Sequence, residues 1–261
     1  MATEIYLGRP PENIVNWIKA EAERKYQEML KTPLTFTAEE AGSTIKMSKS
    51  SSAPTVYLET STTSEEGSWT DFTVCTNDEN GNSNNDGTVI TLANVGDKVY
   101  FRAKQDNQQF ANDIRKANQF VMTGKIAASG NINTLLKADG SVLDLTGRNY
   151  CYNYMFSGCS SLTQAPELPA TTLADYCYSS MFWNCTSLTQ ASELPATTLA
   201  NNCYNGMFGR CVSLTQASFP NLEKETVTTK VVKSQRTFVN AASNIETTCK
   251  DGILIINSTS V

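Results

Sequence analysis

Cys151-Tyr-Asn-Tyr-Met-Phe-Ser-Gly-Cys159 is the first of three closely similar blocks, which recur with a period of 26 residues. The second block is Cys177-Tyr-Ser-Ser-Met-Phe-Trp-Asn-Cys185, and the third is Cys203-Tyr-Asn-Gly-Met-Phe-Gly-Arg-Cys211. Each block is followed by Ser-Leu-Thr-Gln-Ala, at 161–165, 187–191 and 213–217. A fixed period of this length predicts stacked supersecondary units rather than a compact pocketed domain. Stacked units commonly present an extended binding surface.

Each repeat unit is predicted to contain a strand, a turn and a helix. Ser-Leu-Thr-Gln-Ala predicts a short strand with one buried leucine, and Thr171 or Thr172 can cap a helix that runs through Leu173 to Phe182. Because the period is constant, equivalent side chains of neighbouring units stack into a continuous core. The predicted core positions are Cys151, Phe156, Cys159, Leu162, Leu173, Cys177, Phe182, Cys185, Leu188, Leu199, Cys203, Phe208, Cys211 and Leu214.

The repeat pattern covers residues 141–222 and then weakens. Thr237-Phe238-Val-Asn-Ala lies where a fourth Met-Phe block is expected, but 30 residues after the third rather than 26. Gly252-Ile-Leu-Ile-Ile-Asn257 reads as a strand. We therefore predict that 223–261 is a degenerate fourth repeat with a closing strand that caps the open end of the stack.

Residues 34–140 carry the pattern of an antiparallel β-sandwich. About seven short segments rich in β-branched and aromatic residues alternate with turn residues. They include Leu34–Thr37, Thr44–Met47, Thr55–Thr60, Trp69–Val74, Thr88–Leu92 and Lys98–Ala103, with a later pair at Phe120–Ile126 and Asn131–Leu136. Trp69 is expected in the core, with an exposed sugar-stacking ring as the alternative.

Residues 1–33 are predicted to form an arm built on one helix. No Gly or Pro interrupts residues 12–31, and Glu21 precedes Lys25 by four residues, the favourable order for an ion pair. Positions near the 3.6-residue period form an apolar stripe that includes Ile14, Trp17, Ile18, Tyr26 and Met29. This stripe either packs on the chain's own domain or docks on a partner or on copies of itself, and the sequence leaves both interpretations open.

The composition argues against several functional classes. The chain has 21 basic and 26 acidic residues without a basic patch, so no nucleic-acid partner is expected. It has no run of eighteen apolar residues, so no membrane insertion is expected. It also has no histidine, the usual general acid or base near neutral pH and the commonest metal ligand. Residues 1–11 lack the features of a signal peptide, which indicates a trimmed start or a protein made without Sec export.

The cysteines are predicted to pack the core rather than to perform chemistry. Six of the eight belong to the repeat and form three pairs whose members are eight residues apart, whereas zinc ribbons require Cys-x-x-Cys or a similar spacing. Thiols are favoured because nothing points to an oxidising compartment, although disulfides remain open. Cys75 and Cys249 lie outside the repeat, and without histidine nothing marks them as nucleophiles.

Motifs for other chemistry are missing. The chain has no phosphate-binding loop, no dinucleotide-binding glycine pattern and no Gly-x-Ser-x-Gly. Residues 78–87 lack the twelfth-position Glu of a calcium loop and are predicted to form a solvated hairpin loop. Glu65 and Glu66 are predicted to be exposed turn charges rather than a glycosidase pair. We therefore expect no catalytic, metal or cofactor site, and no enzymatic activity.

The repeat resembles a known family. The string Cys-Tyr-x-x-Met-Phe-x-x-Cys-x-Ser-Leu-Thr-Gln-Ala-Pro-Glu-Leu-Pro-Ala-Thr-Thr-Leu-Ala is similar to the BspA-like leucine-rich repeat of gut Bacteroidales and their bacteriophages. Three segments of residues 34–103 resemble the Ig-like module that precedes these repeats in that family. They are Leu34-Thr-Phe-Thr-Ala, Gly67-Ser-Trp-Thr and Asn94-Val-Gly-Asp-Lys-Val-Tyr-Phe-Arg-Ala. The resemblance implies a multidomain, mainly β fold with an N-terminal helix, an Ig-like β-sandwich and a short solenoid. It also implies a non-enzymatic surface or virion protein involved in adhesion.

The start of the chain resembles phage-encoded members of this family. The resemblance lies in Ile5-Tyr-Leu-Gly-Arg-Pro-Pro-Glu-Asn-Ile-Val-Asn-Trp-Ile. Cell-surface members carry a signal or lipoprotein peptide at this place. This favours a head or tail fibre of a crAss-like phage on the virion surface, commonly a homotrimer attached by its N-terminus. The implied partners are capsid or tail proteins, sister chains, and a host-surface glycan or protein. The alternative is a BspA-like adhesin of the bacterial cell surface that lacks its signal sequence here.

Overall fold

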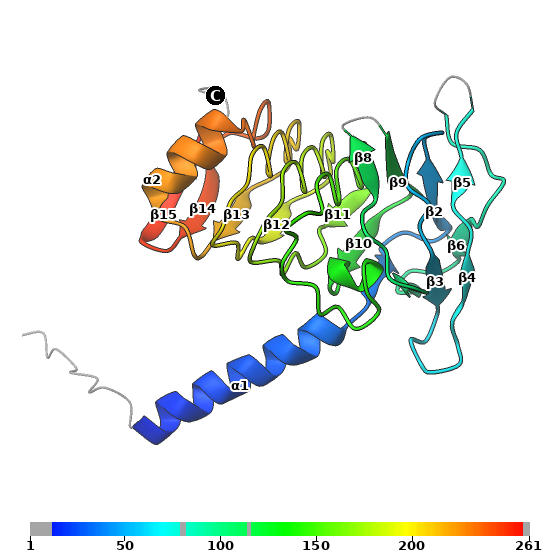
Figure 1. Ribbon diagram of the computed structural model, residues 1–261, viewed down its shortest axis with the longest axis horizontal. Coiled ribbons are helices and arrows are strands. Elements are labelled where there is room, and N and C mark those ends of the chain that lie inside the picture. The colour runs from blue at the N-terminus through cyan, green and yellow to red at the C-terminus, as the bar shows by residue number, and fades with distance from the viewer. Residues whose placement is uncertain (1–11, 79–81, 114–115, 258–261) are drawn as a thin grey trace, which may run out of the picture.

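The fold is mainly β with few helices, and the computed structural model describes residues 12–78, 82–113 and 116–257 (Figure 1). Helix α1 (Glu12–Lys31) precedes the strands, with the bounds that the sequence predicts. The first part of the chain contributes β1 (Leu34–Ala38), β2 (Ser43–Lys49), β3 (Leu58–Ser61), β4 (Thr70–Phe72), β5 (Cys75–Thr76), β6 (Ile90–Leu92), β7 (Lys98–Ala103), β8 (Ala111–Asp113), β9 (Lys116–Thr123) and β10 (Ile126–Ser129). The 3₁₀ helix η1 (Ile132–Leu135) ends this part. The second part contributes β11 (Leu162–Gln164), β12 (Gln190–Glu193), β13 (Gln216–Phe219), α2 (Lys224–Thr226), the π-helical segment η2 (Val227–Ser234), β14 (Ile245–Cys249) and β15 (Gly252–Ile256).

A single ten-stranded sheet runs through both parts of the chain. Its order is β15-β14-β13-β12-β11-β10-β1-β7-β3-β4, and a second sheet has the order β5-β2-β9-β8 with β6 beside β2. The parts join where β10 and β11 pair in parallel, with Ile126 opposite Leu162 and Ala127 opposite Gln164. The boundary predicted at residues 140–141 therefore separates two sequence patterns within one sheet and one hydrophobic core.

Aromatic rings join the two sheets to each other and to the first repeat unit. Phe36 of β1 and Phe101 of β7 meet Phe120 of β9 edge-on, with ring centroids 5.0 and 5.4 Å away. Such edge-to-face pairs are a favoured arrangement of aromatic quadrupoles. Phe156 of the first repeat unit then stacks on Phe120 at 5.2 Å, with the ring planes 11° apart. The core of the sheets therefore continues directly into the core of the repeat.

Two predictions for the first part of the chain are wrong, and β8 was not predicted. Residues 131–136 form η1 rather than a strand, because the Asn131 side chain accepts the N–H of Asn133 at 2.8 Å and caps a helical turn. Trp69 is half-buried rather than in the core. The Arg102 guanidinium lies 4.0 Å from the centroid of its ring, a cation–π contact on the outer face of the sheet.

The helix predicted through Leu173 to Phe182 is also wrong, because each repeat unit folds as a run of tight turns. Every fourth residue has a positive φ, which breaks the α-helical pattern. Half of the amides bond within the turn, as the N–H of Cys177 does to the carbonyl of Ala174 at 3.2 Å. The alternate amides bond to the next unit, as the N–H of Tyr178 does to the carbonyl of Cys203 at 2.9 Å. The positive-φ positions are Tyr150, Tyr154 and Gly158, then Tyr176, Ser180 and Asn184, then Asn202, Gly206 and Arg210.

The run of tight turns, hydrogen-bonded from one unit to the next, forms a turn ladder. Two buried columns of aromatic rings follow from this turn ladder. Phe182 stacks between Phe156 and Phe208, with centroids 5.4 and 5.7 Å away and rings within 5° of parallel. Tyr178 stacks between Tyr152 and Tyr204 in the same way, at 5.7 and 6.1 Å. Because equivalent residues recur every 26 positions, each unit covers the ring face that the preceding unit exposes.

A fourth unit continues the stack after an inserted helical segment. Phe238 stacks on Phe208 at 5.5 Å, although α2 and η2 lie between β13 and this ring and lengthen the spacing to 30 residues. The Gln235 side-chain oxygen accepts the N–H of Tyr204 at 2.6 Å, in place of the backbone carbonyl used one unit earlier. β14 pairs in parallel with β13, and β15 pairs antiparallel with β14, so the strand predicted at Gly252 is confirmed.

The predicted core positions of the repeat are buried, with Leu199 as the exception. Leu199 is half-buried because it borders a cavity of about 460 Å³ between the third unit and η2. Its equivalent one unit earlier, Leu173, is only 4% exposed. The displacement of the chain by η2 therefore leaves one core position of the third unit uncovered.

Candidate interaction surfaces

The charged face of α1 carries the predicted pair of Glu21 with Lys25 and two further ion pairs made by Arg24. Arg24 bonds to Glu21 at 2.7 Å and also pairs with Glu28, and Lys25 lies 3.8 Å from Glu21. The hydrogen bond from Arg24 lowers the pKa of the Glu21 carboxyl. Exposed pairs of this kind contribute little to stability, so the position of the helix depends on its apolar stripe.

The inner end of the stripe packs on the chain's own repeat region. Leu30 is buried, and Tyr26 and Met29 are half-buried. Tyr26 and Met29 line a groove of about 110 Å³ with the last residue of β12 and residues that follow β11 and β12, namely Glu167, Leu168, Pro169, Glu193 and Pro195. Burial raises the pKa of Tyr26 and of Glu167. For this half of the helix, the interpretation that the stripe packs on the chain itself therefore holds.

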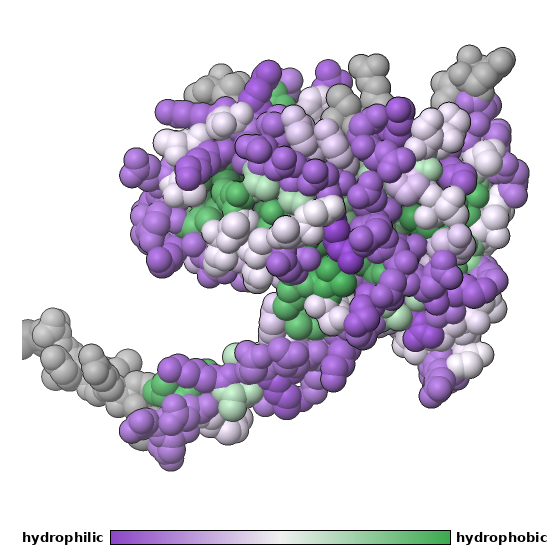
Figure 2. Space-filling model, in the orientation of Figure 1, coloured by the Kyte–Doolittle hydropathy of each residue, from purple (hydrophilic) through white to green (hydrophobic). Residues whose placement is uncertain are grey.

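The outer end of the stripe remains exposed. Ile14, Trp17 and Ile18 have 45%, 66% and 53% of their surface accessible. Figure 2 shows this half of α1 standing clear of the body, with apolar residues near its far end. Clustered exposed apolar side chains mark interaction sites in soluble proteins. The five predicted stripe residues thus divide into two that dock on the chain itself and three that are available to a partner.

One buried asparagine holds the base of the arm. The Asn131 side-chain amide donates to the carbonyl of Leu30 at 2.7 Å and to that of Gly140 at 3.0 Å. Its backbone N–H donates to Thr32 at 2.9 Å. The adjacent Gly130 has φ +74°, and a Cβ there would lie 2.1 Å from the Pro33 carbonyl oxygen. No local sequence pattern marks this short segment as the attachment of α1.

The eight cysteines are buried free thiols. In the repeat they also make a contact that the sequence did not suggest. Cys159, Cys185 and Cys211 donate to the carbonyls of an aromatic residue in the preceding layer, at 3.1, 3.1 and 3.0 Å. Burial raises the pKa of Cys159 and of Cys211 to about 12. These thiols therefore act as core side chains and as donors between units.

The buried thiols predict a loss of stability at alkaline pH. The folded chain holds the Cys159 and Cys211 protons up to a pKa of about 12, against an ordinary value of 9.0. The contribution of these thiols to the free energy of unfolding is fully present below pH 9. It is lost as the pH rises from 9 towards 12, because in this range the thiols ionise only in the unfolded chain. Urea unfolding at pH 8, 9, 10 and 11 measures this. An unfolding free energy that stays constant up to pH 11 would contradict the prediction.

Other candidate chemistry is not assembled in the described part of the chain. No three Cys, Asp or Glu side chains within residues 12–78, 82–113 and 116–257 are placed to hold a metal ion. Within the same ranges, no helix is long and apolar enough to cross a bilayer. Glu65 and Glu66 are exposed, as predicted. In the predicted loop at 78–87, residues 79–81 lie outside the described residues, and hydrogen bonds from Thr76 lower the pKa of Asp86.

The comparisons with known proteins leave the family open. No family model, no curated protein and no solved structure matches the chain.

Proposed function

We propose that this chain is a structural virion protein without enzymatic activity, a fibre or decoration of a phage head or tail. In this proposal it attaches to the particle by its N-terminal arm and presents the repeat region to the host surface. The resemblance of residues 145–222 to BspA-like leucine-rich repeats supports the proposal, with the first part as an Ig-like sandwich and the repeat as a short solenoid. Its partners are capsid or tail proteins, sister chains in a homotrimer, and a host-surface glycan or protein.

The observation that carries the proposal is the exposed half of α1. In the outer half of the 20-residue helix the apolar stripe is exposed, and Trp17 has 66% of its surface accessible. Tryptophan is one of the residues enriched at interface positions that dominate binding. The exposed half of the stripe lies on the same helix as the half that packs on the repeat region. The packed half therefore fixes the direction in which the exposed side chains point.

Trp17→Glu is expected to reduce incorporation of the chain into particles about tenfold or more, as loss of a dominant interface residue does. The free chain should unfold at the same urea concentration as the unsubstituted protein, because the side chain is exposed. Incorporation is measured by quantifying the chain in purified particles assembled with each variant.

Asn16→Glu is the matched control, since it adds the same single negative charge at an exposed position beside Trp17 but outside the stripe. Normal incorporation of Trp17→Glu would reject the arm as the attachment site. Light scattering of the free chain at micromolar concentration tests the homotrimer separately, and a monomer mass counts against self-association through α1.

A further inference from the structure

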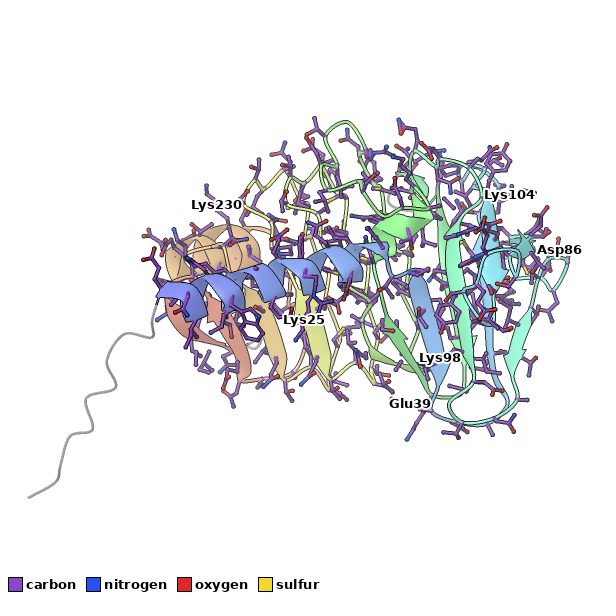
Figure 3. The ribbon with its side chains drawn as sticks, turned by 90° about the horizontal axis from the view of Figure 1, so that it is seen from below. Lys25, Glu39, Asp86, Lys98, Lys104 and Lys230 are labelled. Carbon is purple, nitrogen blue, oxygen red and sulfur yellow. The ribbon has the colours of Figure 1, made fainter. Side chains whose placement is uncertain are left out.

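A polar cavity of about 460 Å³ lies where the regular stack of repeat units is interrupted. The second and third repeat units contribute Asp175, Asn201 and Asn202 to its wall, and η2 contributes Lys230 and Ser234. Figure 3 shows Lys230 on the helical segment at the end of the repeat region. This volume is within the range of small-molecule sites. The cavity is separate from the arm and its groove.

The element that forms one wall of this cavity is unusual. η2 is π-helical over eight residues, whereas most π-helical turns occur as single bulges, often at functional sites. It holds the chain away from the position that the 26-residue period would give it, and this displacement opens the space beside Leu199. The cavity therefore results from a specific insertion rather than from imperfect packing of equal units.

Tyr176 is adjacent to two residues of the cavity wall: it follows Asp175 in the chain, and its backbone N–H donates to the carbonyl of Asn201 at 3.0 Å. Tyr150 and Tyr176 stack at 4.9 Å with their planes 12° apart, and they continue the column of equivalent positions that ends at Asn202. In each of the two buried columns the third unit supplies another ring. In the column of Tyr150 and Tyr176 the third unit supplies the smaller Asn202, which lines the cavity. Among the described residues no second ring covers the outer face of Tyr176, and its side chain is half-exposed.

The lining has the chemistry of a hydroxyl-rich, neutral ligand. Asp175 supplies an acceptor whose orientation is fixed, because its carboxylate accepts the N–H of Asn201 at 2.9 Å. Lys230 supplies a donor, and the amide of Asn202 and the hydroxyl of Ser234 can do either. One formal negative and one formal positive charge cancel, so the lining does not favour an anion. Few apolar side chains line it, so it does not favour an apolar ligand.

We propose that this cavity binds a neutral carbohydrate, with the sugar ring stacked on Tyr176 and its hydroxyls bonded to Asp175, Asn202, Lys230 and Ser234. A pyranose ring matches the site because it offers a flat C–H face to an aromatic ring and hydroxyls that both donate and accept. The inference deepens the proposed adhesive function and rests on it, since it names the ligand class and the place where the repeat region would contact a host surface.

The test is saturation-transfer difference NMR on the full-length free chain. The probes are lactose, maltose, cellobiose and mannobiose at millimolar concentration, with N-acetyl-triglycine methylamide as a peptide probe. At least one disaccharide is expected to receive saturation at its ring C–H protons. Tyr176→Ala and Lys230→Ala are each expected to weaken that binding about tenfold, the effect of one stacking or charge-assisted contact.

Tyr154→Ala is the matched control, because Tyr154 is a half-buried tyrosine with a similar backbone (φ 60°) that lies outside the cavity. Lys230 is exposed, so its variant reports on binding even if Tyr176→Ala folds poorly. Absence of any disaccharide signal would overturn the proposal. So would binding that neither variant weakens, and binding of the peptide probe alone would assign the cavity to protein.

This experiment separates the inference from the proposed attachment. Sugar binding is measured on the free chain, and incorporation is measured on particles. If no disaccharide binds while Trp17→Glu still blocks incorporation, only the carbohydrate site is rejected. If sugar binds while Trp17→Glu is incorporated normally, only attachment through the arm is rejected.

Discussion

Phe182→Ala is expected to lower the free energy of unfolding by about 3–5 kcal/mol, the usual range for removing a buried phenylalanine ring. Phe182 is fully buried and is stacked on both faces, by Phe156 at 5.4 Å and by Phe208 at 5.7 Å. The turn ladder fixes the separation of these neighbours by hydrogen bonds between units, so they cannot close the space that the ring leaves. Urea unfolding followed by circular dichroism measures the loss.

Val212→Ala is the control for Phe182→Ala, since it lies in the same turn ladder but is 60% exposed. It is expected to change the unfolding free energy by no more than about 0.5 kcal/mol. A loss below about 1 kcal/mol for Phe182→Ala would show that neighbouring units relax into the cavity. The column of rings would then not be the main source of cohesion in the repeat.

Asn131→Ala is expected to lower the free energy of unfolding by about 2–4 kcal/mol, because it leaves several buried groups without partners. The substitution removes the donor to Leu30 and Gly140 and the acceptor for the N–H of Asn133. The last turn of α1 loses one of its attachments at the same time. Amide hydrogen exchange in residues 26–31 is therefore expected to accelerate relative to the rest of the chain.

Asn153→Ala is the matched control for this prediction. Asn153 is also a fully buried asparagine, but its amide makes one hydrogen bond, to Ser179 at 2.9 Å, and no described residue bonds its Oδ1. It is expected to cost about 1 kcal/mol and to leave exchange in α1 unchanged. Equal losses for the two variants, or unchanged exchange at residues 26–31 in Asn131→Ala, would contradict the role of Asn131 as the base of the arm.

Local sequence patterns predicted the elements whose stability depends on neighbouring residues in the chain. The bounds of α1 follow from an uninterrupted helical pattern between prolines, and the ring columns follow from the constant period. The turn ladder was missed because Leu173, Cys177 and Met181 are four residues apart, a spacing that suits an α-helix as well as a ladder with one left-handed residue in four. Gly158, Asn184 and Gly206 occupy left-handed positions, and residues of these types were the available signal.

The candidate sites depend on contacts that are distant in the sequence. Asn131 meets Leu30 across a separation of 101 residues, and the cavity forms only because η2 displaces the chain beside Asn202. Returning charges after residue 222 indicated a change of structure there, but no local pattern distinguishes a π-helical insertion from a loop. The division of the arm into a packed half and an exposed half likewise requires knowledge of where the repeat surface ends.

The parallel addition of one strand for each repeat unit sets a distance in this molecule. α1 rests on residues at the end of β12 and after β11 and β12, whereas β14 and β15 close the stack beyond β13. Neighbouring strands are about 4.8 Å apart, so each 26-residue duplication inserted between β12 and β13 would separate the arm from the closing strands by about that amount. The packing of α1 and of the closing strands would be unchanged. The distance from the arm to the far end of the stack is therefore adjustable in fixed steps by tandem duplication alone.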